Sequence, residues 1–149
     1  MKIPSKVIIA GVEIDIEIQD KSHFNCGNPQ SALDGDYSHA FYRIRIFKNA
    51  VFLDDTEAVT VKQRDTERTF FHEMWHCYIH FLNEDTKLNS ELYATIFSNV
   101  CNMNIQRHNI YNELMKKALE EIRKKGLLII SDIQAKRLFW IIENTKIVE

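Results

Sequence analysis

The chain has 149 residues, of which 45% are hydrophobic and 27% charged, and its formal net charge is −2. This length suits one domain with its own core, so we expect a single domain over residues 1–149. The acidic balance argues against direct nucleic-acid binding, and the lack of 18 consecutive apolar residues argues against a membrane span. Three cysteines without a CxxC pair, and no signal-peptide core, favour a soluble protein of the reducing cytoplasm.

The N-terminal segment predicts a β-hairpin. Val7 to Ile9 precede a turn at Ala10-Gly11, and hydrophobic residues from Val12 to Ile18 then alternate with acidic ones. Residues 19–38 break this pattern with glycines and an Asn-Pro pair, so we expect a long connection, and such loops are usually either functional or mobile. Within it, Cys26 is a candidate metal ligand or inhibitory thiolate, although a lone loop cysteine is more often a bystander.

The segment Phe41 to Phe47 predicts a half-exposed strand. Its apolar and aromatic residues alternate with Arg43 and Arg45. The cationic face that results serves either solvation or the protection of a sheet edge. After an apolar and acidic connection, a long helix is predicted from Val61 to Leu82. Thr60 and Gln63 form its expected capping box, and Asn83 is its expected stop.

This helix carries an HExxH motif at His72, Glu73 and His76. One turn separates the two histidines, so both imidazoles can bind one metal ion, with Glu73 beside them. The alternative is a core helix whose histidines bond to backbone carbonyls, but that alternative leaves Glu73 without a role. The surrounding residues are almost all apolar, and a metal gives all three buried polar groups a partner. The motif therefore predicts a zinc hydrolase.

A second helix is predicted to begin at Ser90-Glu91, with Asn89 as its cap, after a short polar loop that makes the two helices neighbours. A catalytic zinc has three protein ligands and an open position, so Glu91 is the leading candidate for the third ligand. The helix macrodipole alone also favours an acid there, but Ala94, one turn further on, allows the helices to approach closely. His80 is an alternative ligand that fits better as a pocket or core histidine.

Two more helices are predicted in the C-terminal part. Apolar residues from Tyr111 to Ile122 recur at helical spacing, with Glu/Lys pairs at i,i+4 outside and Gly126 as the terminator. After a buried connector, Leu127 to Ile130, Ser131 and Gln134 form the capping box of the last helix. These elements predict an α+β fold, in which a small antiparallel or mixed sheet packs on a helical hairpin that carries the zinc site, with C-terminal helices covering it.

The two stretches FFHEMWH and ELYATIFSNV resemble the ImmA/IrrE-like metallopeptidases, minimal gluzincins common in phages, mobile elements and bacterial regulatory operons. The family pattern of HExxH, ExxA and a later phenylalanine matches His72, Glu73, His76, Glu91, Ala94 and Phe97. The resemblance covers roughly Asn25 to Cys101, including a Gly-containing loop and an I-x-I strand before the helix. It departs after Glu91, because Thr95 stands where larger gluzincins have an acidic residue, and Ser98 where the family often has alanine.

These observations together predict a zinc metallopeptidase. We expect His72, His76 and Glu91 to bind one Zn²⁺ ion and Glu73 to act as the catalytic base. The substrate is expected to be an extended protein or peptide segment, and the resemblance suggests a regulatory protein such as a repressor. A further side chain should donate to the oxyanion, and the candidates are Tyr37, Tyr42, Tyr93, His39, His80 and His108.

An exposed sheet edge can pair with an extended peptide. We therefore expect Phe41 to Phe47 to be the substrate edge, with the binding residues Tyr42, Arg43, Ile44 and Arg45. If the two arginines project toward the cleft, they favour acidic residues beside the cleaved bond.

Two rival functions share parts of this pattern. One is a SprT-like peptidase that acts on DNA-associated proteins, against which the acidic balance and the absence of a zinc ribbon weigh. The other is a catalytically silent module that keeps zinc for stability. Structural zinc sites usually fill all four positions with protein ligands, so three ligands favour the enzyme.

Overall fold

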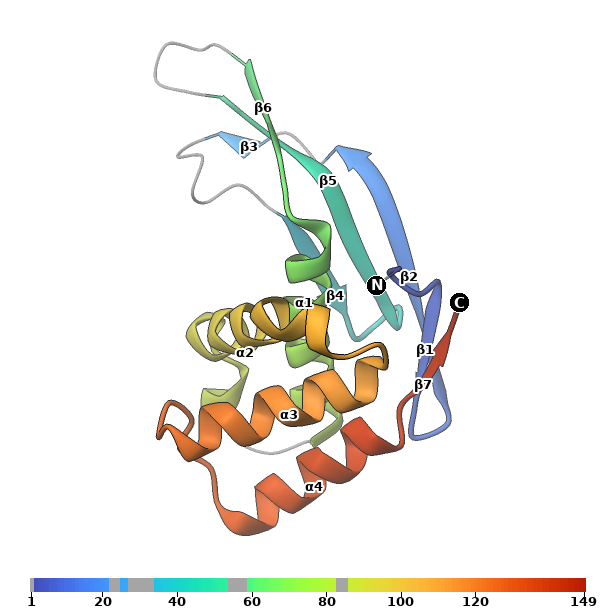
Figure 1. The fold of residues 1–149 in the computed structure, drawn as a ribbon. Coiled ribbons are helices and arrows are strands. Elements are labelled where there is room, and N and C mark those ends of the chain that lie inside the picture. The colour runs from blue at the N-terminus through green and yellow to red at the C-terminus, as the bar shows by residue number, and fades with distance from the viewer. Residues whose placement is uncertain (1, 22–24, 27–33, 54–58, 83–85) are drawn as a thin grey trace.

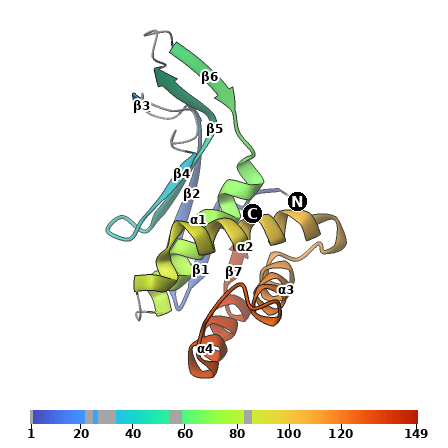
Figure 2. The ribbon, with the colours of Figure 1, turned by 90° about the vertical axis from the view of Figure 1, so that its left-hand side faces the viewer.

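The structure, a computed structural model, describes residues 2–21, 25–26, 34–53, 59–82 and 86–149. The strands are β1 (Lys6–Ile9), β2 (Val12–Lys21), β3 (Asn25–Cys26), β4 (Gly35–Ser38), β5 (Arg43–Leu53), β6 (Val59–Gln63) and β7 (Lys146–Val148). The helices are α1 (Thr66–Leu82), α2 (Glu91–Asn104), α3 (Tyr111–Lys124) and α4 (Asp132–Glu143), with short 3₁₀ turns at Thr86–Asn89 and Ile105–Arg107. The predicted α+β fold class is confirmed, and helices α1 to α4 lie on one side of the sheet (Figures 1 and 2).

The sheet is mixed and is built around β5. Its order is β3-β5-β2-β1-β7, while β4 and β6 also pair with β5. The pairs β2·β5 and β3·β5 are parallel, and the other pairs are antiparallel. The end of the sheet where β5 pairs with β6 extends beyond the helices (Figure 1). Along the part that faces α1, β5 pairs with β2 on one side and with β4 on the other.

The N-terminal hairpin forms as predicted. Ala10 and Gly11 have φ angles of 51° and 81°, the left-handed pair that a tight turn between two twisted strands requires. In β2, Ile14 and Ile16 are buried, and the acidic residues that alternate with them, Glu13, Asp15 and Glu17, are exposed. Strand β7, which pairs with β1, is absent from the prediction because three residues are too few for an alternating pattern to appear.

The prediction of an irregular connection over residues 19–38 is wrong at three places: β2 continues to Lys21, Asn25–Cys26 forms β3, and Gly35–Ser38 forms β4 against β5. Its sequence, GDYS, has neither the alternation nor the composition typical of a strand. Gly35 is required at its position, because an added Cβ would lie 2.6 Å from both the Arg45 carbonyl oxygen and the Thr69 Cγ2 atom. The absence of a side chain there lets β4 lie directly against α1.

Both predicted N-terminal boundaries of the helical hairpin need correction. Helix α1 begins at Thr66 rather than Val61, and the expected capping residues Thr60 and Gln63 belong to β6. The alternating stretch VTVKQ pairs with β5, which outweighs its helical propensity. Helix α2 is capped by Ser90, not Asn89, since the Tyr93 amide donates to the Ser90 hydroxyl at 3.2 Å. Asn83 lies outside the described residues.

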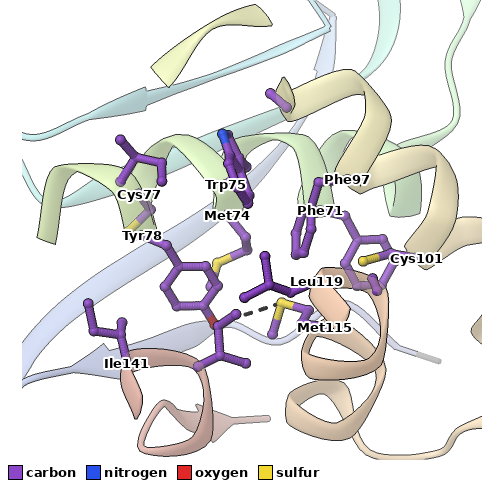
Figure 3. Packing of buried hydrophobic residues seen from close by; sticks show 14 of the residues in the cluster. Phe71, Met74, Trp75, Cys77, Tyr78, Phe97, Cys101, Met115, Leu119 and Ile141 are labelled. Carbon is purple, nitrogen blue, oxygen red and sulfur yellow. Dashed lines mark hydrogen bonds between the residues drawn. The ribbon is translucent and has the colours of Figure 1, made fainter. Parts of the chain in front are cut away.

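Helix α1 forms the centre of the core and packs against the sheet, α2 and α4. Figure 3 shows its apolar side chains among residues of α2, α3 and α4. The Trp75 indole stacks at a tilt on Phe97, with centroids 5.1 Å apart, and its N–H donates to the Leu88 carbonyl at 2.8 Å. Ala94 is fully buried, as expected for a close approach of α1 and α2. Packing on these sides leaves the polar face of α1 uncovered, so that face can line a functional site.

The C-terminal helices cover this core. Gly126 ends α3 with a φ of 71°, and the capping box at Ser131 and Gln134 is present, both as predicted. Of the expected connector Leu127 to Ile130, only Leu128 is buried while Ile129 is 83% exposed, so the prediction of a buried connector is wrong. Within the described part of the chain, none of the helices combines the length and apolar character needed to cross a membrane.

Candidate metal centre

A cleft of about 780 Å³ runs along the polar face of α1. Its walls come from α1, the first turns of α2, and β4 with the residue before it. The side chains or backbone that matter for chemistry are those of Gly35, Tyr37, His72, Glu73, His76, His80 and Glu91. The cleft thus gathers the HExxH motif and the expected third ligand in one open space.

His72, His76 and Glu91 meet in this cleft. The two Nε2 atoms of the histidines are 3.3 Å apart, and each lies 2.9 Å from a different carboxylate oxygen of Glu91. One ligand atom from each residue lies within 4.8 Å of the others. Two imidazole nitrogens and one carboxylate are a donor set found in catalytic zinc sites. The residues present therefore fit the predicted metal ion.

Asn89 holds His76, the second candidate zinc ligand, in place. The sequence did not predict this role. The Nδ1 atom of His76 lies 2.7 Å from the Asn89 side-chain oxygen, and donation from Nδ1–H leaves the Nε2 lone pair for a ligand bond. Asn89 was expected to cap α2, but the cap is Ser90. In the sequence, the sign of this role is a polar residue two places before the expected third ligand.

Glu73 lies at the bottom of the cleft and is only 7% exposed. Burial is the main cause that raises its pKa to about 8, and the carboxylates of Glu91, Asp36 and Asp34 raise it further. The Cβ position of Gly35 is 3.5 Å from the Glu73 side chain, so β4 forms part of this environment. Burial also lowers the pKa of His72, which favours the neutral imidazole that binds metal.

The raised pKa of Glu73 predicts a specific pH dependence for the stability of the metal-free protein. The folded protein holds a proton that the unfolded chain releases above the ordinary value of 4.5, so the free energy of unfolding falls between pH 4.5 and about 8. Glu73→Gln removes this titration. We expect the variant to be more stable than the wild type by about 2 to 4 kcal/mol at pH 8 and nearly equal at pH 4.5. Urea unfolding in a chelator at both pH values measures this difference, and parallel pH profiles would contradict it.

The expected substrate residues Tyr42, Arg43, Ile44 and Arg45 are not among the residues that line the cleft. Ile44 pairs with Ile16 of β2 on one side and with Tyr37 of β4 on the other, so the expectation of an exposed edge is wrong. Because Ile44 is buried, the arginines beside it point to the opposite face of the sheet. There the Arg45 Nε atom donates to Asp36 at 2.8 Å.

Among the expected oxyanion donors, Tyr37 and His80 line the cleft, whereas Tyr42, Tyr93, His39 and His108 are not among its lining residues. The Tyr37 hydroxyl lies 2.7 Å from the His39 Nδ1 atom. His80 does not belong to the metal-ligand group found among the described residues. The side chain of Cys26 lies outside the described part.

Comparison of the chain with protein-family models, curated proteins and solved structures finds no match. The function is therefore inferred from the geometry of the cleft and from the motif itself.

Proposed function

We propose that this protein is a zinc-dependent peptidase of the HExxH and ExxA type, similar to the ImmA/IrrE-like enzymes. The observation that carries the proposal is the meeting of His72, His76 and Glu91 in one open cleft, with Glu73 buried beside them. Glu91 comes from a second helix and is 79% exposed on its side chain, yet both of its oxygens lie 2.9 Å from the histidines. An exposed carboxylate aimed at two imidazoles suits a metal ligand.

In this proposal, His72, His76 and Glu91 hold one Zn²⁺ ion. When bound, zinc supplies Lewis-acid chemistry, which makes a water molecule more acidic and polarises the carbonyl to be attacked. Glu73 takes the proton of the attacking water and later delivers it to the leaving amine. Asn89 keeps the His76 ring in the orientation that the ligand bond needs. A positive ion beside Glu73 also lowers its pKa below the value in the metal-free protein, which favours its role as a base.

The edge of the sheet that lies along this cleft is β4. The Phe47 amide donates to the Asp34 carbonyl oxygen at 2.9 Å, and the register pairs Gly35 with Ile46 and Tyr37 with Ile44. Since antiparallel pairs alternate, the backbone N–H and C=O of Gly35 and Tyr37 point away from β5. Among the described strands, β4 pairs only with β5.

An extended peptide can add to β4 through these outward groups. We therefore move the expected substrate edge from β5 to β4. Backbone pairing requires an unfolded segment, so the proposed substrate is a flexible or locally unfolded part of a protein, and a repressor linker fits the resemblance. The proposal involves neither a membrane nor a nucleic acid as a partner.

A proline at Tyr37 tests the substrate edge. It removes the outward N–H without breaking a bond to β5, and proline is tolerated on an edge strand. We expect Tyr37→Pro to cleave a labelled peptide mixture about two- to tenfold more slowly than Tyr37→Ala, the matched control that keeps the N–H. Zinc content and melting temperature are compared first. Equal rates for two folded, zinc-loaded variants would show that substrate does not pair with β4.

A further inference from the structure

Five rings gather near the C-terminal end of α1, and two of them, Tyr37 and His80, line the cleft. This ring cluster consists of Tyr37, His39, Tyr42, His80 and Phe81. The imidazoles of His39 and His80 stack with centroids 4.5 Å apart and an angle of 11° between their planes. The Tyr37 ring lies 5.5 Å from His80, and His39 meets Tyr42 and Phe81 edge-on at 5.3 and 5.9 Å. Neither the metal ligands nor the proposed base belong to this cluster.

The ring cluster lies beside the path that a substrate paired with β4 would follow. Gly35 contacts the α1 turn that holds Glu73, and Tyr37, two residues later, contacts His80. Strand β4 thus follows α1 from the proposed base toward the cluster. Along the helix, His80 is about 6 Å from His76 and about 12 Å from His72. An extended peptide advances about 3.3 Å per residue, so these distances correspond to about two to four residues.

The chemistry of the cluster is aromatic. The imidazoles of His39 and His80 lie nearly parallel, with their centroids 4.5 Å apart, so they offer ring surface rather than a fixed charge. The cluster contains no lysine or arginine to bind an acidic side chain. His80 lines the cleft and is exposed, and the His39 ring stacks on one of its two faces. Tyr37 stands at a tilt to His80 on the β4 side, and Tyr42 is 40% exposed.

We propose that the ring cluster is a specificity subsite that takes an aromatic side chain of the substrate, about two to four residues from the cleaved bond on one side. His80 provides the ring surface that the side chain contacts, and Tyr37 and His39 hold His80 in position. The inference rests on the proposed function, because the cleaved bond sets the origin from which the subsite is counted. An aromatic pair contributes about two- to tenfold in preference.

The test is a peptide library made by tryptic digestion of a whole proteome, cut by zinc-loaded protein and sequenced by mass spectrometry. We expect Phe, Tyr and Trp to be enriched about two- to tenfold at one position in this interval. His80→Ala should lose the enrichment with zinc content unchanged, and His80→Phe, the matched control that keeps a ring, should retain it. Three results would overturn the subsite: cleavage without aromatic enrichment, enrichment of acidic residues instead, or aromatic enrichment that survives His80→Ala. Each of them still shows cleavage, so the proposed peptidase activity would be supported.

A binding experiment decides the subsite if the wild-type protein cuts nothing, a result that would count against the peptidase itself. Immobilised, zinc-loaded Glu73→Gln protein is exposed to the same library, and the retained peptides are sequenced. Retention of aromatic peptides that is lost when His80→Ala is added supports the subsite. Equal retention by the single and double variants, or no retention by either, overturns it.

Discussion

Glu73→Gln is expected to retain zinc and its fold but to lose hydrolysis, with kcat/KM lowered about 10²- to 10⁴-fold. Gln keeps the size of the side chain but cannot accept the proton of the attacking water. The change is also compatible with the site, because Glu73 is buried and a neutral amide costs less to bury than a carboxylate. Activity on a labelled peptide mixture, zinc content by elemental analysis and melting temperature are measured on the same samples.

Glu67→Gln is the matched control, since it makes the same change on the same helix and Glu67 is not among the residues that line the cleft. We expect this control to keep wild-type activity. Full activity in zinc-loaded Glu73→Gln would overturn the mechanism. A silent zinc module makes a different prediction, namely no turnover in the wild type either.

The Glu73→Gln protein also serves as bait, because it should hold substrate without cutting it. Mass spectrometry of the proteins that it retains from a lysate would name candidate substrates.

Alanine at His72, His76 or Glu91 is expected to cause the largest losses of metal affinity. Each change removes one of three ligand groups that meet within 4.8 Å. Asn89→Ala removes only the partner of His76 and should weaken zinc binding about 10- to 100-fold. The three ligand variants should each exceed that loss. Competition with a chelator of known affinity measures all four variants, and elemental analysis measures the occupancy as isolated.

His80→Ala is the control for this series, because His80 lines the same cleft but lies outside the ligand group. It should bind zinc as the wild type does. Unfolding does not obscure the Glu91 result, since that side chain is 79% exposed and its removal leaves no cavity. If Glu91→Ala keeps full occupancy while His80→Ala or Cys26→Ala loses it, the third ligand is assigned wrongly.

The parts of the site that one helix positions follow from local spacing in the chain. His72 and His76 share a face because an α-helix repeats every 3.6 residues, and this geometry needs no distant partner. The hairpin turn at Ala10-Gly11 and the capping box at Ser131 are local in the same sense, since their bonds join residues a few positions apart. The close approach of α2 to α1 could also be predicted, because a small residue, Ala94, follows Glu91 by one turn.

The strand that borders the cleft could not be predicted in this way, because its position depends on contacts between elements that are distant in the chain. Alternation in a sequence shows which face of a strand is buried, but it does not show which strand lies beside it, because pairing uses backbone groups that nearly all residues share. The stretch Phe41 to Phe47 therefore had the pattern of an edge strand although β5 is central. Strand β4 showed no pattern at all, and its place depends on the contact of Gly35 with Thr69, a residue 34 positions away in the chain. The bond from Asn89 to His76 is likewise a contact between elements, which spacing along one element cannot reveal.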